Sequence, residues 1–316
     1  MLSALIDDLS RIPGVRVVTT WDSRLGDCML KNCDVQLVQS PLSEPFAFAE
    51  QVEQSDVVWV IAPETDGALL GRRIEFDSIV RHSKTPGRQR RFVGANANAL
   101  VQTSSKQTLF DLLCRQGIST PETRDFDFAK SKEGWEDWPI IIKPDDGAGS
   151  QNTFLVRNGL DFFNAWRELQ DLEDPESLIQ QPFIPGKALS VALLIVEDGS
   201  ILEVLPVAEQ HLSDDGRFRY LGGRIPANIS AESMIAVQQL AKRACHAVPG
   251  LTGYVGCDLV LPDDFPFEPV LIEINPRLTT SYLGYRALTD DNIAARLLDR
   301  NTPPLRWKSE AVTFTV

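Results

Sequence analysis

Short apolar runs alternate with an amphipathic stretch near the start of the chain, and this alternation constrains the fold more than any other feature. β-Branched residues are frequent from Val15 to Thr20 and from Val57 to Ala62, and the stretch Glu44 to Glu53 between them has a helical pattern. Alternating strands and helices favour a parallel sheet whose carboxyl-terminal loops carry ligands. We therefore expect Thr19 to Asp22 and Pro63 to Gly67 at the ligand-binding edge of an α/β lobe.

Apolar spacing and turn residues predict the remaining elements. A third short strand, Arg91 to Val93, closes the first lobe near residue 94. A single helix is expected from Asn98 to Gln116, because its leucines fall on one face, and Gly117 ends it. Further predictions are strands at Trp138–Pro144, Thr153–Val156, Ser177–Phe183 and Ala188–Val196, helices at Leu160–Leu172 and Ala231–Ala247, and a hairpin of Tyr254–Leu261 with Val270–Ile274.

The charge balance argues against nucleic acid as a partner. The 316 residues include 44 Asp and Glu against 31 Lys and Arg, a net charge of −13. A surface that follows phosphates needs clustered basic residues. The densest basic stretch, Arg72 to Arg91, is interrupted by Glu75 and Asp77, so we interpret it as a solvated face.

Neither a membrane span nor a secretion signal is predicted. The apolar runs are short, such as Val57 to Ala62, and far below the roughly 18 residues that a span requires. Asp7 and Asp8 stand where a signal peptide has a basic start, so we expect a cytoplasmic protein. The cysteines, at positions 28, 33, 114, 245 and 257, contain no Cys-x-x-Cys pair and indicate reduced thiols.

The first candidate site is Lys143 with the glycine-rich segment Asp145 to Ser150. A lysine at the end of a buried strand, beside glycines that allow backbone N–H groups to approach closely, can hold a phosphate. The segment lacks the Gly-Lys-Ser/Thr of a Walker A loop, and a strand follows where a dinucleotide-binding fold would have a helix. An ordinary hairpin turn is the alternative interpretation.

The second candidate is a metal site on the predicted hairpin. Glu273 and Asn275 lie two residues apart on one strand and share a face, and Asp258 lies on the paired strand. Three such oxygen ligands suit Mg²⁺, which also bridges substrate phosphates. The alternative is an ion pair of an acidic residue with Arg277 or Arg224.

The third candidate is the run Gln181 to Gly186. Pro182 cannot donate to a central ladder, so we expect an edge strand or a crossing between lobes. An adenine could bind the free backbone groups of such a strand. A plain linker is the alternative.

Taken together and in this order, these segments resemble the ATP-grasp superfamily. Lys106 resembles its first phosphate-binding lysine, Lys143 the second, and Asp145 to Ser150, which includes Gly147, Gly149 and Ser150, the loop that covers the phosphates. Gln181, Phe183 and Ile184 resemble its adenine-binding hinge. Asp258, Glu273 and Asn275 resemble its metal ligands, and Arg277 the arginine that steadies the transferring phosphoryl group.

This resemblance implies an ATP-grasp fold, α+β in the ATP-binding lobes, with a Rossmann-like pre-ATP-grasp lobe at 1–94, a small lobe at 95–180 and a large lobe at 181–316. It implies ATP and Mg²⁺ as cofactors, two ions being expected and Mn²⁺ able to substitute, and it suggests a homodimer. One departure is Lys187-Ala188, where many members have a ribose-binding glutamate just after the hinge glycine.

A narrower resemblance is to the tyramine-glutamate ligase group, which acts in methanofuran biosynthesis and has relatives in the bacterial tetrahydromethanopterin C1 pathway. It rests on four segments: Thr19–Leu25, Ala62–Gly67, Phe218–Pro226 and Asn275–Tyr282. The resemblance implies that ATP activates the γ-carboxylate of glutamate as an acyl phosphate, which an aromatic amine such as tyramine or tyrosine then attacks.

Two further hypotheses concern individual residues. Arg277 and Arg224 could clamp the carboxylate or the acyl phosphate, because guanidinium binds such groups through two hydrogen bonds. Glu64, Asp66 or His211 could hold and deprotonate the ammonium of the amine. Alternatives to the whole interpretation are a ligase for other amino acids or for polyglutamate extension, and a nucleotide-binding regulatory subunit without turnover.

Overall fold

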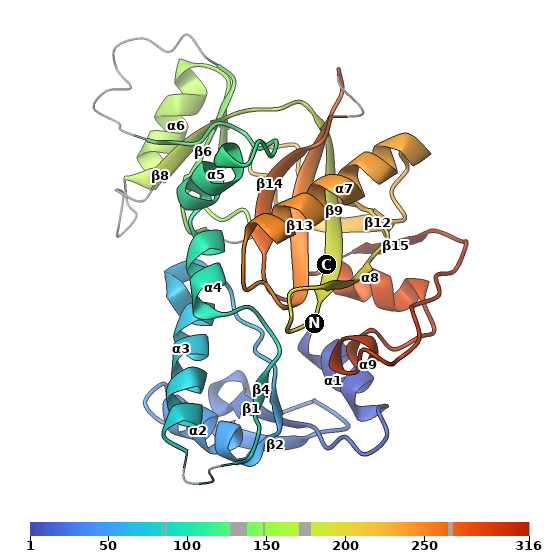
Figure 1. The fold of residues 1–316 in the computed structure, drawn as a ribbon. Helices are drawn as coiled ribbons and strands as arrows, with labels where there is room; N and C mark the ends of the chain where they lie inside the picture. The colour runs from blue at the N-terminus through green and yellow to red at the C-terminus, as the bar shows by residue number, and fades with distance from the viewer. Residues whose placement is uncertain are drawn as a thin grey trace.

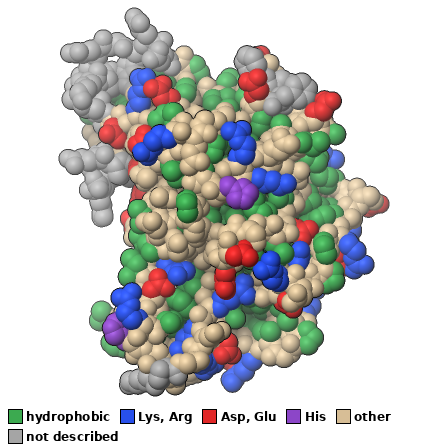
Figure 2. Space-filling view, viewed as in Figure 1, with side chains coloured by type: hydrophobic (Ala, Val, Ile, Leu, Met, Phe, Trp, Pro, Cys, Tyr) green, Lys and Arg blue, Asp and Glu red, His purple; other side chains and the backbone are tan. Residues whose placement is uncertain are grey.

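The structure, a computed structural model, describes residues 1–83, 85, 87–126, 138–147, 149–170, 178–264 and 268–315. In Figure 1 a small sheet and a large sheet lie in the upper half of the molecule, and an α/β lobe lies below them. Acidic and basic side chains are interspersed over the face drawn in Figure 2. No helix of the described ranges is long and apolar enough to cross a membrane.

The N-terminal lobe contains the predicted parallel strands. β1 (Val18–Asp22) pairs with β2 (Asp34–Val38), and β3 (Val57–Val58) pairs with β4 (Arg91–Phe92), both in parallel register. The strands form two separate pairs, and β3 is shorter than the apolar run Val57 to Ala62 had suggested. Two short 3-10 turns, η1 (Ser23–Leu25) and η2 (Thr65–Gly67), and the helices α2 (Glu44–Gln54) and α3 (Ala68–Arg81) complete the lobe.

The first helix, α1 (Leu2–Ser10), packs against the C-terminal helices α8 (Ser281–Leu288) and α9 (Ile293–Leu298). Asp8 is buried there and accepts hydrogen bonds from Tyr282 and Arg286. This packing joins residues at the two ends of the sequence (Figure 1). The domain boundaries at residues 94 and 180 stay predictions.

The expected helix from Asn98 to Gln116 is in fact two helices, α4 (Ala97–Ser104) and α5 (Lys106–Arg115). Ser105 has an extended backbone, with φ −96° and ψ 119°, and its hydroxyl accepts a hydrogen bond from the Thr108 N–H. Serine commonly caps helices in this way. The interruption places Lys106 in the first turn of a new helix.

The small lobe consists of a four-stranded sheet and the helix α6 (Gly159–Leu169). Its strands are antiparallel in the order β5-β8-β6-β7: β5 (Arg124–Asp125), β8 (Leu178–Pro182), β6 (Ile140–Pro144) and β7 (Phe154–Val156). Of the two expectations for the Pro182 strand, the edge position is wrong, because β8 is internal, whereas the crossing between lobes is confirmed, because the chain passes directly from β8 into the large sheet. β5 pairs only with Ile179 and Gln180, so the ladder on that side ends before Pro182.

The large lobe is built on a seven-stranded antiparallel sheet. Its main order is β14-β13-β9-β11-β12-β15, and β10 also pairs with β9. The helix α7 (Ala231–Ala247) packs on one face of the sheet, while α8 and α9 cover part of the other. The strands are β9 (Gly186–Ile195), β10 (Ile201–Val204), β11 (Ala208–Leu212), β12 (Tyr220–Ile225), β13 (Gly253–Pro262), β14 (Val270–Asn275) and β15 (Val312–Thr315).

Candidate active site

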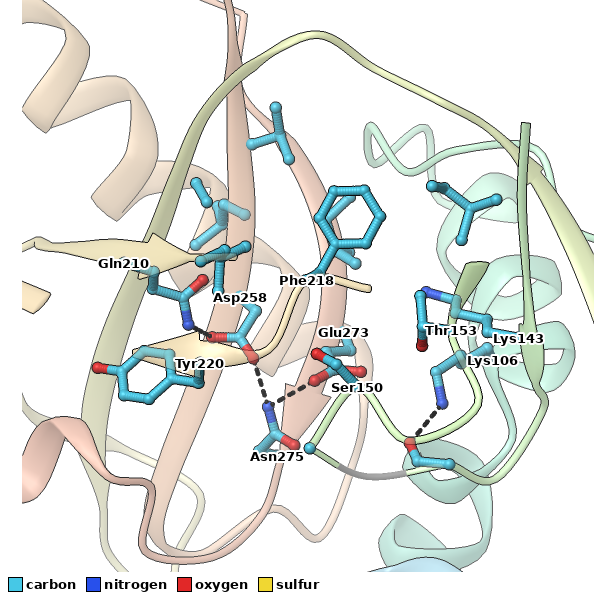
Figure 3. Close-up of a pocket in the computed structure, with 18 of the residues that line it drawn as sticks. Lys106, Lys143, Ser150, Thr153, Gln210, Phe218, Tyr220, Asp258, Glu273 and Asn275 are labelled. Carbon is cyan, nitrogen blue, oxygen red and sulfur yellow. Dashed lines mark hydrogen bonds between the residues drawn. The ribbon is translucent and has the colours of Figure 1, made fainter. Parts of the chain in front are cut away.

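A cavity lies between the small and the large lobe (Figure 3). Its volume is about 270 Å³, close to the lower end of the roughly 300–1,000 Å³ of small-molecule sites. Its walls contain these residues that the sequence had singled out: Lys106, Lys143, Gly147, Gly149, Ser150, Gln181, Phe183, Ile184, Asp258, Glu273, Asn275 and Arg277.

Two buried lysines lie on the small-lobe side of the cavity (Figure 3). Lys143 lies near the end of β6, where burial and the neighbouring charge of Lys106 lower its pKa to about 8. The Lys106 ammonium donates to the carbonyl oxygens of Asp145 and Gly147, at 3.0 and 2.8 Å. Two ammonium groups so close together, with little water, are arranged to receive an anion such as a polyphosphate.

The glycine-rich loop is attached to the start of α5. The Asp145 carboxylate accepts a hydrogen bond from the Gln107 N–H at 2.8 Å, and the Asp145 carbonyl accepts one from the Lys106 N–H at 3.2 Å. Further along, Gly149 and Ser150 have φ of 68° and 61°, the left-handed region that glycine adopts without strain. Asp145 thus anchors the start of the loop to α5, beside the two lysines.

The predicted metal ligands face one another on the large sheet. Asp258 of β13 is the direct cross-strand partner of Glu273 on β14. The Asn275 amide donates to Asp258 at 2.9 Å and to Glu273 at 3.3 Å, and Gln210 donates to the other oxygen of Asp258 at 2.9 Å. Cross-strand pairing therefore brings Asp258 next to Glu273, 15 positions further along the chain. Asn275 joins them because it lies on the same face of β14 as Glu273.

The electrostatics of this group fit a cation. Burial and the neighbouring Glu273 carboxylate raise the pKa of Asp258 well above its ordinary value. Burial alone would raise the pKa of Glu273 too, but the charges of Lys106 and Lys143 outweigh it and lower that pKa. Two adjacent buried carboxylates repel each other unless a proton or a cation lies between them.

The donor set also suits Mg²⁺, which takes oxygen ligands and usually keeps substrate phosphates and water in its shell. In the described ranges, no group of three or more His, Cys, Asp or Glu side chains is arranged to hold a metal ion. An ion here would therefore bind two carboxylates and need Asn275 or phosphate oxygens as well. Flipping the Asn275 side-chain amide would exchange its oxygen and NH₂ group, so that the oxygen faces Asp258 and Glu273.

The hinge between the lobes lines the other end of the cavity. The Gln181 amide donates to the Thr123 hydroxyl at 2.8 Å, and the Phe183 N–H donates to the Pro139 carbonyl at 3.0 Å. The Ile184 N–H donates to no described residue, so it remains a candidate donor for a base. Ala188 lines the cavity at the position where a ribose-binding glutamate had been expected.

Arg277 connects this site to the N-terminal lobe. Its Nε donates to Glu64 at 2.7 Å. Glu64 is 8% exposed, and its other carboxylate oxygen is buried without a hydrogen-bond partner among the described residues. Burial raises the pKa of Glu64, and the charge of Arg277 opposes that rise.

Four predicted site residues do not line the cavity: Glu64, which pairs with Arg277, and Arg224, His211 and Asp66. Arg224 of β12 is the cross-strand partner of Glu209, whereas its neighbour Gly223 pairs with the cavity residue Gln210. Since side chains alternate along a strand, Arg224 lies on the opposite face of the sheet. His211 alternates with Gln210 in the same way and is exposed, and Asp66 is exposed too, its N–H donating to Asp146 at 3.2 Å.

The cavity also contains residues that the sequence predictions missed. They come from strands that were not predicted, β11 and β12, from the loop between them, and from the segment after Arg277. Only the similarity of two quoted segments, Phe218–Pro226 and Asn275–Tyr282, had pointed to some of them. They include Gln210, Leu212, Phe218, Tyr220, Thr279, Thr280 and Ser281.

Comparison with known protein families agrees with this geometry. An ATP-grasp domain matches residues 103–281, and a pre ATP-grasp 3 domain matches residues 15–75. The chain belongs to the ATP-grasp family. The predicted fold class is thereby confirmed, with the pre-ATP-grasp domain matching in the N-terminal lobe.

The relatives of this ATP-grasp chain include ligases of two kinds. Tyramine–L-glutamate ligase from Methanocaldococcus fervens is 29% identical over 267 residues, which cover 84% of this chain and 72% of that protein. D-Alanine–D-alanine ligase from Gloeobacter violaceus is 30% identical over 227 residues, covering 66% of this chain and 71% of the relative. The chain is an ATP-grasp ligase.

Solved structures have the same fold. An ATP-grasp superfamily protein from Archaeoglobus fulgidus has a TM-score of 0.61 and 27% identity, covering 84% of this chain and 75% of that one. N5-carboxyaminoimidazole synthetase from Staphylococcus aureus, solved with ADP, has a TM-score of 0.74 at 13% identity, covering 96% of this chain and 76% of that chain.

Proposed function

We propose that this ATP-grasp ligase joins the γ-carboxylate of glutamate to tyramine or tyrosine, with cleavage of ATP to ADP and phosphate. The observation that carries the proposal is one cavity with two buried lysines on one wall and the group Asp258, Glu273 and Asn275 on the other. The choice of substrates is supported by the tyramine–L-glutamate ligases among the relatives, which match over most of this chain.

In this proposal the small lobe holds the polyphosphate of ATP. Lys106 and Lys143 neutralise phosphate charge, and the loop attached through Asp145 covers it. The hinge at Phe183 and Ile184 receives the adenine. Mg²⁺, held by Asp258, Glu273 and Asn275, would supply positive charge to the phosphates.

The reaction then needs positioning more than it needs a protein nucleophile. A carboxylate oxygen of the acid attacks the γ-phosphorus, the bond from that phosphorus to ADP breaks, and an acyl phosphate forms. The amine nitrogen next attacks the acyl carbon, phosphate leaves, and the nitrogen loses a proton. Arg277 is the cationic side chain at the cavity wall suited to stabilise the charge on the acyl phosphate.

Glu64 is the side chain best suited to the amine. One of its carboxylate oxygens binds Arg277, and the other is unpartnered but buried outside the cavity lining, so it becomes available to an ammonium only on a rearrangement of this wall. A carboxylate with a raised pKa can also accept the proton that the amine must lose. Replacement by Gln should raise the KM for the amine and lower the rate; unchanged values of both would exclude this role.

The experiment that tests the proposal measures ADP release with Mg-ATP and identifies the products by mass spectrometry. Glutamate is offered with tyramine, with tyrosine, with other amines and with no amine, and D-alanine is offered alone. A glutamyl-tyramine or glutamyl-tyrosine product supports the proposal. An alanyl-alanine product, or ADP release only with another pair, would assign the site to different substrates. Nucleotide binding without ADP release under every condition would favour a regulatory subunit.

A further inference from the structure

The loop between β11 and β12, residues 213–219, reaches from the large lobe onto the small lobe. The Leu155 N–H on β7 donates to the Gly216 carbonyl at 2.9 Å. β7 is the last strand of the small sheet in its order β5-β8-β6-β7, so this bond gives its outer edge a partner. Gly216 is buried at the contact and has φ +79°, a backbone conformation that favours glycine.

The next residue, Arg217, strengthens the contact with two further interactions. Its guanidinium carbon lies 3.9 Å from the centre of the Phe154 ring on β7, within the range of a cation–π interaction. The same guanidinium forms an ion pair with Glu168 of α6 at 2.5 Å. One arginine of the large lobe thus holds both a strand and the helix of the small lobe.

Phe218, the residue after Arg217, lines the cavity. Its φ is +54°, which is rare for a bulky side chain and persists only where the surroundings impose it. The Phe218 ring lies 6.1 Å from that of Phe183 in the hinge, and Figure 3 shows Phe218 between the two walls of the site. The backbone is constrained both by the contacts of Gly216 and Arg217 with the small lobe and by hydrogen bonds between Ser213 and Arg219 within the loop.

We propose that residues 213–219 form a latch that holds the small lobe closed against the large lobe, with Arg217 as its positioning residue. The latch fixes the distance between the two walls of the cavity and sets Phe218 at the hinge side, where the proposed function places the base of the nucleotide. Only this last step rests on the proposed function. The closing of the lobes follows from the contacts themselves.

Hydrogen exchange of the nucleotide-free protein tests the latch without any assumption about the reaction. In Arg217→Ala we expect the Leu155 amide to exchange about tenfold faster than in the wild type. The stabilisation lost with the cation–π contact and the ion pair corresponds to about a tenfold change in an equilibrium constant. The matched control is Arg219→Ala. Arg219 lies in the same loop and is paired with Asp215 at 2.6 Å within that loop, so its removal changes the charge equally.

A second variant, Glu168→Gln, removes the ion pair and retains the ring contact, so it should give a smaller increase than Arg217→Ala. Equal exchange at Leu155 in Arg217→Ala, Glu168→Gln and Arg219→Ala would overturn the latch. Faster exchange at Leu155 in Arg217→Ala and Glu168→Gln, but not in Arg219→Ala, supports the latch. If Arg217→Ala is only partly folded, the comparison of Glu168→Gln with Arg219→Ala decides the test.

Kinetics separate the latch from the proposed function. Arg217→Ala should raise the KM for ATP about fivefold with little change in kcat, since the residue touches no reacting group. An unchanged KM for ATP would overturn the placing of Phe218 at the nucleotide. If the wild type binds neither ATP nor ADP while Arg217→Ala still exchanges faster at Leu155, the latch is supported and the proposed function is the part that fails.

Discussion

The Nε of Arg277 lies 2.7 Å from a carboxylate oxygen of Glu64. Because Arg277 lies just after the end of β14, this ion pair connects the strand that carries Glu273 and Asn275 to the N-terminal lobe. The two residues are separated by 213 positions in the sequence. Glu64 is almost fully buried and Arg277 is half-buried, so each charge depends on the other for compensation. The pair therefore couples the lobes as well as forming part of the site.

Breaking this pair should destabilise the protein. In Arg277→Ala the buried Glu64 carboxylate loses its partner, and we expect a loss of about 3–5 kcal/mol in the free energy of unfolding. Urea denaturation measures it. Arg277→Ala combined with Glu64→Gln should recover part of the loss, because no buried charge is then left unpaired. Additive losses in the double variant would show that the two residues act independently.

Glu273→Gln should abolish ADP formation, by more than about a hundredfold, and leave the fold intact. Without magnesium its thermal midpoint should be somewhat below that of the wild type, because the change removes the attraction of the Glu273 carboxylate to Lys106 and Lys143, which lowers the pKa of Glu273 in the folded protein. The matched control is Glu268→Gln, which removes an exposed carboxylate from the turn of the same hairpin. Normal turnover by Glu273→Gln would show that the metal ligands are wrongly assigned.

Nucleotide binding should weaken as the pH rises above about 8, where Lys143 loses its proton in the free protein. The protonated lysine is the form that binds phosphate. Above that pKa the protein must therefore take up a proton to bind, and the affinity falls up to about tenfold per pH unit. Calorimetric titration with ADP between pH 6.5 and 9.5 measures the effect. Lys143→Arg stays charged throughout, so a decline of equal steepness in this variant would contradict the assignment.

Gly256→Ala should lower the free energy of unfolding by about 1–3 kcal/mol, because overpacking forces neighbouring groups apart. A Cβ at this position would lie 2.5 Å from the Cγ2 methyl of Thr279. Thr279→Ser removes that methyl and keeps the hydroxyl that contacts Tyr254, so the double variant should recover most of the loss. Urea denaturation of the single and double variants tests the contact, and no recovery would mean that another neighbour is responsible.

Much of the site follows from short segments whose local pattern is strong. Lys143 at the end of an apolar strand, the glycines after it, and the two-residue spacing of Glu273 and Asn275 could all be interpreted without coordinates. The helix α7 begins and ends where its apolar period predicts. The break at Ser105 was missed because both helices present leucines with a compatible period, and only the capping by its side chain divides them.

Arg224, His211 and Asp66 show where such reasoning stops. Strand alternation decides which side chains enter the cavity, and it can be used only when the strand and its register are known. β11 and β12 have weak apolar alternation, so Gln210 and Tyr220 were not expected in the site. Arg224, which was expected to bind the carboxylate or the acyl phosphate, lies on the opposite face of the sheet.

The sequence by itself determined the family, most of the strands and helices around the nucleotide site, and which residues have the chemistry for phosphate and metal. These features depend on neighbours within a few positions along the chain, so local patterns record them. Only the tertiary structure decided that Glu64 pairs with Arg277, that α1 packs with the C-terminal helices, and that the loop at Arg217 closes on β7. Such contacts arise from the way separate lobes pack, and no local period of the sequence encodes the distance between them.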